Sequence, residues 1–322
     1  MQGTIAILKW LGRIREQERM TFMITVLGSI NIDLVARTQR LPRPGETVAG
    51  EAFAVEAGGK GANQALAARR AGVDVRFVGA VGQDPFADMA LALLDEAGVD
   101  LGNVRRLQTP TGTALISVTG DGENAIIVVP GANGELAGTD VDAAIASMQE
   151  GDVLMLQLEI PVPMVERALV LSRQKGVTTI LNLAPALPEA SALAALADIV
   201  IANETEFQLL VGGDPLALED LDAKLKDLHG ISGQSFIVTM GAEGVTAIHE
   251  GQIHRTKGLT ITPVDTVGAG DTFCGYLAAS IAARLPFPDA LRRAAAAGSL
   301  ACTRPGAQKA IPTGFEVQSA IG

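Results

Sequence analysis

The sequence predicts an α/β fold: a three-layer α/β/α sandwich with a mostly parallel central sheet and a small β-sheet lid. Short, uninterrupted apolar runs alternate with alanine-rich stretches of helical length, which is typical of a parallel sheet covered by helices on both faces. Hydrophobic residues make up 48% of the 322 residues and charged residues 19%, so the chain can bury a large core. Two segments with alternating polarity interrupt this rhythm, and they predict the lid.

The expected strands of the central sheet are the apolar runs at residues 23–28, 75–81, 153–157, 178–182, 199–202 and 235–240. The expected helices include residues 62–70, 164–175 and 290–303. The lid segments lie near residues 33–57 and 109–129, where alternation predicts antiparallel strands with one wet face. Aromatic residues are only 3% of the chain, so we expect small side chains to bring helices and sheet close together.

No repeat, linker or low-complexity block divides the rest of the chain. We therefore expect one domain at residues 23–322 that includes the lid. Residues 1–22 are expected to form an N-terminal extension. Their apolar run, residues 5–11, precedes the basic stretch 13–19, which is the wrong charge order for a signal peptide.

The charge and cysteine content exclude several classes of protein. A formal net charge of −11 argues against a nucleic-acid partner, because such proteins need a basic face. No apolar run approaches the roughly 18–20 residues that span a bilayer. Two cysteines are too few for a disulfide framework and fit a reducing cytoplasm. Because a chain with this negative net charge would repel a nucleotide, any phosphate site must be built locally from backbone amides and a metal ion.

The strongest local signal is the segment DTVGAGDTF at residues 265–273, which precedes an alanine-rich stretch. Its glycines allow a tight turn that points several N–H groups at one place, at a helix N-terminus that favours anions. Asp271 places a carboxylate inside this anion site. Phosphoryl transfer to an alcohol needs both parts, amides for the phosphoryl group and a base for the hydroxyl. The alternative is an ordinary glycine turn in which Asp271 caps the helix.

The second signal is the segment GGKGANQA at residues 58–65. Its glycines bring backbone close to a ligand, and Asn63 offers both a donor and an acceptor, as a neutral polyhydroxy ligand requires. The segment lacks the Lys-Ser/Thr ending of a Walker A loop. The alternative is a helix start without a ligand, in which Lys60 is solvated.

The third signal is the segment GSINID at residues 28–33, which ends the first strand. Ligands of open α/β sheets bind beyond the carboxyl ends of the strands, where Asn31 and Asp33 would share one face and hold vicinal hydroxyls. The alternative is a turn formed by Asn and Asp. The segment does not supply the Gly-x-Gly-x-x-Gly pattern that a nicotinamide-dependent dehydrogenase would need.

These segments occur in a familiar order together with LPRPGET at 41–47, QLE at 157–159 and NETE at 203–206. From about residue 23 to residue 312, the chain resembles the ribokinase branch of the PfkB family of carbohydrate kinases. The resemblance implies a sugar kinase that uses ATP, Mg²⁺ and a K⁺ activator, most simply to make D-ribose 5-phosphate from D-ribose. It also implies a homodimer formed through the lid.

The resemblance further implies the roles of individual residues. Asp271 would be the catalytic base, with the amides of Gly268, Ala269 and Gly270 forming the anion hole. The sugar-binding positions would be Asn31, Asp33, Gly58, Gly59, Lys60, Asn63, Glu159 and Asp271. The nucleotide-binding positions would be Asn203, Thr239, Gly241, Gly244 and Gly270. Glu206 would hold magnesium through water, and the potassium positions, mostly through carbonyl oxygens, would be Asp265, Val267, Ala301, Arg304 and Gly306.

Two positions depart from the family pattern. Ala310 stands where a hydroxyl-bearing residue often completes the cation loop, and Ala295 stands where a polar residue near the adenine is usual. Two alternatives to a ribose kinase remain. One is a related kinase acting on fructose, deoxyribose, 2-keto-3-deoxygluconate or a nucleoside. The other is a non-catalytic sugar or nucleotide sensor, whose expected mark is the loss of the base or the glycine loop, both of which are present here.

Overall fold

The computed structural model describes residues 22–120, 123–212 and 220–322. The expected N-terminal extension, apart from Phe22, therefore lies outside the described residues.

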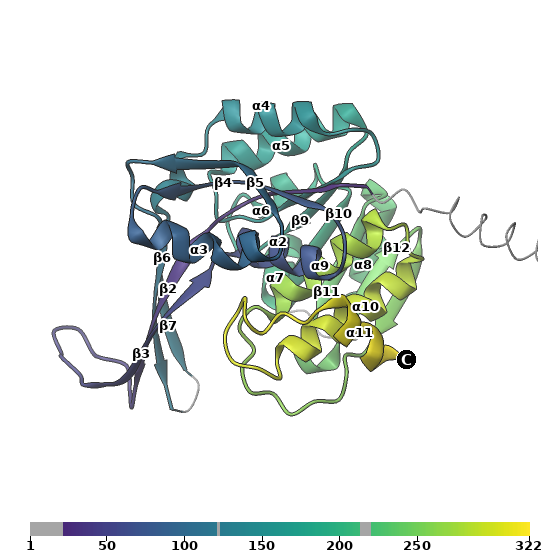
Figure 1. Cartoon of the computed structure of the whole chain (residues 1–322). Coiled ribbons are helices and arrows are strands. Elements are labelled where there is room, and N and C mark those ends of the chain that lie inside the picture. The colour runs from purple at the N-terminus through teal and green to yellow at the C-terminus, as the bar shows by residue number, and fades with distance from the viewer. Residues whose placement is uncertain (1–21, 121–122, 213–219) are drawn as a thin grey trace, which may run out of the picture.

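A nine-stranded sheet runs through the middle of the molecule (Figure 1). Its strands, in spatial order, are β13 (Gln252–Thr256), β12 (Val245–His249), β11 (Ser235–Thr239), β10 (Ile199–Asn203), β9 (Thr178–Asn182), β8 (Val153–Leu156), β1 (Ile24–Leu27), β4 (Val75–Gly82) and β5 (Asp100–Leu107). Adjacent strands are parallel except in the pairs β11–β12 and β12–β13. The edge strand β5 was not predicted, because it is half-exposed and carries charged residues instead of an apolar run.

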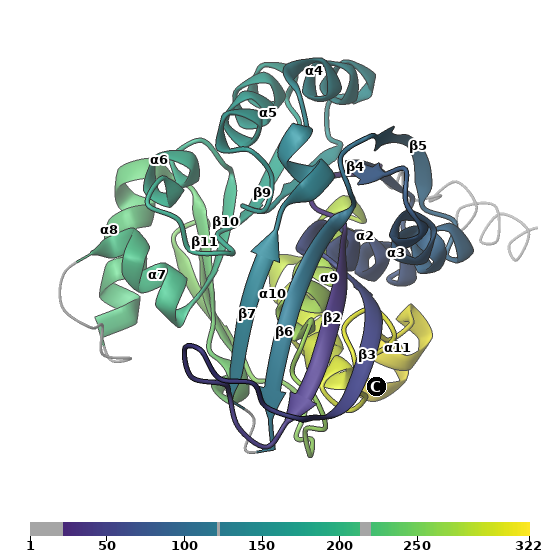
Figure 2. The ribbon, with the colours of Figure 1, turned by 90° about the vertical axis from the view of Figure 1, so that its left-hand side faces the viewer.

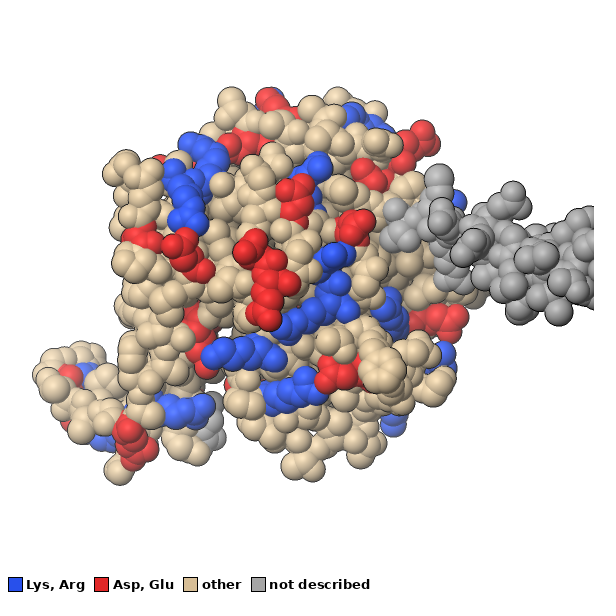
Figure 3. All heavy atoms as spheres, in the orientation of Figure 1, with Lys and Arg blue, Asp and Glu red and all other residues tan. Residues whose placement is uncertain are grey.

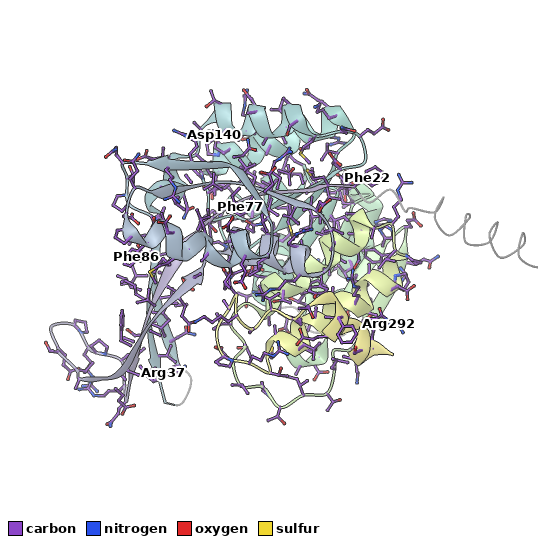
Figure 4. The ribbon with its side chains drawn as sticks, in the orientation of Figure 1. Phe22, Arg37, Phe77, Phe86, Asp140 and Arg292 are labelled. Atoms are coloured by element: carbon purple, nitrogen blue, oxygen red, sulfur yellow. The ribbon has the colours of Figure 1, made fainter. Side chains whose placement is uncertain are left out.

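Helices cover both faces of this sheet, so the three-layer sandwich is confirmed. One face is covered by α2 (Lys60–Arg70), α3 (Pro85–Glu96), α9 (Ala269–Ala282), α10 (Phe287–Ala301) and α11 (Gly314–Ile321), and the other by α4 (Gly138–Ser147), α5 (Val162–Lys175), α6 (Ala190–Ala194), α7 (Glu204–Val211) and α8 (Leu221–Ser232). Side chains of β1 alternate between the two layers, since Ile24 and Val26 enter one core and Leu27 the other. Figure 4 shows the buried Phe77 of β4 inside the body.

The lid is a separate sheet of four strands that projects from the body (Figures 1 and 2). In spatial order the strands are β3 (Gly50–Gly58), β2 (Asn31–Thr38), β6 (Gly112–Thr119) and β7 (Asn124–Val129). The expectation of antiparallel pairing is right for β2–β3 and β6–β7 but wrong for β2–β6, which is parallel. The reason is that β2 and β6 both leave the body in the same direction, with Asn31 opposite Gly112.

Acidic and basic side chains are interspersed over the face of the molecule shown in Figure 3. Among the described helices, none combines the length and the apolar character that a bilayer crossing requires.

Helices α2 and α9 approach each other so closely that one contact position tolerates only glycine. A Cβ atom added to Gly275 of α9 would lie 2.5 Å from the Cβ of Ala67 and 2.5 Å from the carbonyl oxygen of Gln64, both on α2. This contact agrees with the small-residue packing expected from the composition. It also fixes the spacing between the two helices that carry Asn63 and Asp271.

We expect Gly275→Ala to destabilise the fold by about 1–3 kcal/mol, because the atoms it would meet include backbone and cannot rotate away. Urea unfolding of the variant and the wild type measures this difference. Gly230→Ala in α8 is the matched control, because a Cβ there meets no atom within 4 Å. A helical glycine replaced in open space should gain up to about 1 kcal/mol. Equal stability of Gly275→Ala and the wild type would show that the two helices are not in such close contact.

Candidate active site

Asp271 lies in the first turn of α9 and is only 8% exposed. Its two carboxylate oxygens each accept a hydrogen bond from an amide of α2. Asn63 Nδ2 donates to Oδ2 at 2.9 Å, and Gln64 Nε2 donates to Oδ1 at 2.9 Å. The N-cap of α9 is Gly268, with φ of 75°, so the alternative in which Asp271 caps the helix is wrong. The carboxylate is instead held in place by a different helix.

A buried amide network continues from Gln64 into the sheet. Gln157 Nε2 donates to Gln64 Oε1 at 2.6 Å, and Gln64 Nε2 also donates to Asn182 Oδ1 at 3.1 Å. All three amides are buried: Gln64 lies on α2, Gln157 directly follows β8, and Asn182 ends β9. Sequence reasoning did not single them out, although Gln64 and Gln157 lie within two of the segments that it quoted. The feature of the sequence that could have identified these amides is an uncharged polar residue within an otherwise apolar helix or strand.

Lys60 and Glu159 meet beside this network. Glu159 Oε2 accepts hydrogen bonds from Ser29 Oγ at 2.6 Å and from the backbone N–H of Lys60 at 3.1 Å. Burial lowers the pKa of the Lys60 ammonium, but the carboxylates of Asp271, Glu159 and Glu206 together outweigh burial and raise it. Lys60 is therefore a charged, half-buried group beside these carboxylates.

A cavity of about 140 Å³ lies at this end of the sheet. It brings together seven of the residues that the resemblance singled out, namely Lys60, Asn203, Glu206, Thr239, Gly268, Gly270 and Asp271. These residues come from six different elements or loops, so only the fold makes them neighbours. Cys274, one turn after Asp271, also lines the cavity, and burial raises the pKa of its thiol well above the usual value.

Asn203 and Glu206 bind each other at the start of α7. The backbone N–H of Glu206 donates to Asn203 Oδ1 at 2.8 Å, and the backbone N–H of Asn203 donates to Glu206 Oε2 at 2.9 Å. This capping box holds both side chains at the cavity wall. Burial raises the pKa of the Glu206 carboxyl, and the bond from Asn203 opposes that rise.

The expected sugar-binding residues Asn31 and Asp33 lie where the lid leaves the body. They belong to strand β2, where Asn31 is opposite Gly58 and Asp33 is opposite Glu56 of β3, so the alternative of a turn is wrong. Asn31 Oδ1 accepts a hydrogen bond from Asn133 Nδ2 at 2.8 Å. Asn133 was not predicted, because it lies in the short 3₁₀ helix η1 (Gly131–Glu135), far from every quoted segment.

The pKa of the Asp33 carboxyl is raised to about 7, mainly by burial. Three neighbouring carboxylates add to the rise: Glu159, Glu56 and Asp271. The ammonium of Lys60 acts in the opposite direction. Near neutral pH this residue therefore exchanges between a form that donates a hydrogen bond and one that only accepts.

Gly59 is the N-cap of α2 and has a φ of 91°, which favours glycine. A Cβ atom there would lie 2.7 Å from the backbone nitrogen of Asn31 and 2.9 Å from the carbonyl oxygen of Ser29. Gly59 is thus required by the close approach of two backbone segments, whether or not a ligand is bound.

The expected potassium positions lie on two loops that Asp265 joins. Asp265 Oδ1 accepts from the backbone N–H of Val267 at 3.0 Å, and Oδ2 accepts from that of Gly306 at 2.9 Å. Ala301 ends α10, and the guanidinium of Arg304 forms an ion pair with Glu316 of α11. Ala307, on the second loop, would contact a Cβ placed on Gly268, so this pair of loops borders the glycine turn before Asp271.

Two expected nucleotide-binding residues lie apart from the cavity wall. Gly241 and Gly244 flank the 3₁₀ helix η3 (Gly241–Glu243) between β11 and β12, whereas Thr239 at the end of β11 lines the cavity. Within the described ranges there is no cluster of three or more His, Cys, Asp or Glu side chains suited to a metal ion. A magnesium ion here would therefore need ligands from substrate phosphates and water, as Mg²⁺ commonly has.

We expect Asp33→Asn to make stability less sensitive to pH. The carboxyl ionises near pH 3.8 when exposed and at about 7 in the fold, so between these values the folded state retains a proton that the unfolded chain has lost. The free energy of unfolding of the wild type should therefore fall over this interval, by at most roughly 4 kcal/mol. Urea unfolding from about pH 4 to about pH 8 should show a growing advantage of the variant. A constant difference would contradict the raised pKa.

Comparisons with known proteins show the family of the chain. The model of the pfkB family of carbohydrate kinases matches residues 21–314. The chain is 35% identical over 291 residues to a ribokinase of Haemophilus influenzae, covering 90% of this chain and 95% of that protein. It is 32% identical over 292 residues to a deoxyribokinase of Salmonella typhi, covering 90% of this chain and 95% of that protein.

The fold is also similar to that of a solved structure, Arabidopsis thaliana ribokinase complexed with ribose and ATP. The TM-score is 0.85 with 31% identity, and the match covers 94% of this chain and 99% of that one. Because the family match spans the lid, the central sheet and the cavity, the chain belongs to the pfkB family of carbohydrate kinases.

Proposed function

We propose that this carbohydrate kinase transfers the terminal phosphoryl group of ATP to the 5-hydroxyl of D-ribose, giving D-ribose 5-phosphate. The observation that carries the proposal is the Asp271 carboxylate, held by two amides beside a glycine-rich helix N-terminus. Asp271 takes the proton of the attacking hydroxyl as the new P–O bond forms. The N–H groups of residues 268–270 stabilise the negative charge on the phosphoryl oxygens.

On the proposed sugar-binding side of the site, one buried oxygen atom lacks a hydrogen-bond donor among the described residues. Within the described residues, the buried Oδ1 atom of Asn63 has no hydrogen-bond partner, while its Nδ2 atom is bound to Asp271. A buried acceptor without a donor is unfavourable, and a sugar hydroxyl would supply that donor. Bound there, the hydroxyl would lie next to the base. Glu159, Lys60, Asn31, Asp33 and Gly58 would surround the rest of the sugar.

The nucleotide side is expected at the cavity wall formed by Asn203, Glu206 and Thr239. Magnesium, when bound with the nucleotide, neutralises phosphate charge. Glu206 suits an ion held through water, because a single carboxylate cannot replace the hydration shell of Mg²⁺. The ammonium of Lys60 adds a fixed positive charge to a site that otherwise contains several carboxylates.

A potassium ion fits the two loops that Asp265 joins. Within the part of the chain that the structure describes, the carbonyl oxygens of Val267, Arg304 and Gly306 accept no hydrogen bond from the protein. Such oxygens suit K⁺, which carbonyl dipoles coordinate well. The buried Ala310 supplies no hydroxyl, so water would complete the shell.

The choice of D-ribose over other acceptors rests on the lid strand and on the relatives. Asn31 and Asp33, two residues apart on one face of β2, can hold adjacent hydroxyls. The Haemophilus relative is named a ribokinase, and the Arabidopsis structure contains ribose and ATP. The Salmonella relative is named a deoxyribokinase, so deoxyribose is the principal competitor. A site that binds the 2-hydroxyl would reject deoxyribose, since its polar groups would lose their partner.

We expect ADP release to be fastest with ribose among ribose, deoxyribose, fructose, 2-keto-3-deoxygluconate and adenosine, and to increase several-fold when potassium is added. If the protein is an active kinase but prefers another acceptor, the ribose assignment is overturned, whereas the proposed phosphoryl transfer from ATP is not. An absence of turnover with all five acceptors would favour a sensor. Equal rates with and without potassium would remove the proposed cation role.

We also propose that two copies of the chain associate through their lids. Side chains alternate across the lid, so Leu115 and Ile127 lie opposite each other on the face away from Asp33, where Phe53 is also found. These three side chains are 44%, 63% and 66% exposed, respectively. Such an apolar face on a thin sheet is typical of an interaction surface.

We expect Ile127→Arg to convert a dimer into a monomer, because the new charge would be buried at the contact. Light scattering after gel filtration measures the mass of each species. The control is Ile231→Arg on α8, which is 86% exposed and distant from the lid. A wild-type chain that runs as a monomer at tens of micromolar, or an Ile127→Arg variant that stays dimeric, would rule out the lid contact.

A further inference from the structure

A polarised chain of side-chain amides ends at the carboxylate of Asp271. Gln157 Nε2 donates to Gln64 Oε1 at 2.6 Å, and Gln64 Nε2 donates to Asp271 Oδ1 at 2.9 Å. Gln64 and Gln157 are both fully buried, with no exposed surface. A buried polar side chain is costly unless it is bonded, so these two amides need a reason to be there.

The chemistry of these groups determines which end of each side-chain amide donates its hydrogen bond and which end accepts one. An ionised carboxylate can only accept, so the NH₂ group of Gln64 must face Asp271 and its carbonyl oxygen must face Gln157. Gln157 must then present its own NH₂ group. The second N–H of Gln64 donates to Asn182 Oδ1 at 3.1 Å, which uses both hydrogens of that amide. The Asp271 carboxylate therefore determines the orientation of both glutamine amides.

The branch of this network through Asn182 is anchored in the sheet. Asn182 Nδ2 donates to the carbonyl oxygen of Ile201 in β10 at 3.3 Å. The amide of Gln157 passes over Gly28, since a Cβ added there would lie 2.1 Å from Gln157 Oε1. The same Cβ would lie 2.8 Å from the Cα of Gly61, so Gly28 is required both by the Gln157 amide and by the backbone of α2. The network joins the ends of β1, β8, β9 and β10 to α2, and through α2 to the first turn of α9.

We propose that Gln64 and Gln157 are positioning residues that orient the Asp271 carboxylate, with Gln157 acting only through Gln64. The proposal rests on the proposed role of Asp271 as the base. Asn63 touches the other carboxylate oxygen and is left to bind the acceptor, so the two neighbouring amides of α2 have different tasks. Without the donor of Gln64, the Asp271 carboxylate could rotate about its Cβ–Cγ bond and lose alignment with the attacking hydroxyl.

The test compares Gln64→Leu, Gln157→Leu and the double variant with the acceptor that the wild type prefers. We expect kcat to fall by about 10- to 100-fold for Gln64→Leu, as misalignment of a catalytic group typically costs. KM for ATP should change less than about twofold, because the nucleotide side is untouched. Gln157→Leu should lower kcat less. The double variant should match Gln64→Leu alone, because the second loss removes nothing further.

The matched control is Gln234→Leu. Gln234 Nε2 donates to the carbonyl oxygens of Ala194 and Ala197, at the opposite end of the sheet, so the variant also loses partly buried side-chain amide bonds. Its kcat should equal that of the wild type. Asp271→Asn is the reference for the base. Full turnover of Asp271→Asn would refute the role of the base, whereas an inactive Asp271→Asn with an active Gln64→Leu would refute the positioning role alone.

Gln64→Glu has nearly the same shape and provides a second readout if Gln64→Leu does not fold. A glutamate can donate to Asp271 only while protonated, so its kcat should fall as pH rises over the range where the wild type retains activity. A wild-type pH profile for this variant, or multiplicative losses in the double leucine variant, would overturn the proposal. Circular dichroism and urea unfolding establish that each variant is folded.

Discussion

The rest of the site depends on the contact between α2 and α9. These helices are distant in the sequence, yet one carries the amides of Asn63 and Gln64 and the other carries the carboxylate that they bind. Gly275 allows the two backbones to approach closely enough for these bonds to form. Because the carboxylate is bonded from outside its own helix, its orientation depends on tertiary packing and not on the local backbone of α9.

The electrostatics of the site follow from the crowding of carboxylates in one place. Glu159 and Asp271 help to raise the pKa of Asp33, and Asp271 helps to raise the pKa of Glu206. The ammonium of Lys60 opposes both rises. A chain with a net charge of −11 provides no general attraction for a nucleotide. Local positive charge must therefore come from groups such as Lys60 and the backbone amides, and phosphoryl transfer requires such charge.

The lid joins the body of the enzyme at the proposed acceptor site. Strand β2 begins at Asn31, shortly after β1 ends, so the strand that carries the proposed acceptor-binding residues Asn31 and Asp33 is also the base of the lid. A sheet attached in this way can cover the acceptor and exclude water while its other face remains free for a second copy. In Figure 4, Arg37 lies on the lid away from the body, which shows how far the sheet extends beyond the site.

The sequence by itself determined the three-layer fold, because uninterrupted apolar strands between helices have few other solutions. It also identified Asp271, the glycine segments and the lid, since glycine patterns and alternation are local properties. Only the tertiary structure decided the parallel pairing of β2 with β6, the edge strand β5, and the hydrogen bonds of the buried amides Asn133, Gln64, Gln157 and Asn182. Buried side-chain amides follow no characteristic spacing along the sequence. Their hydrogen-bond partners become evident only when the fold brings distant strands and helices together.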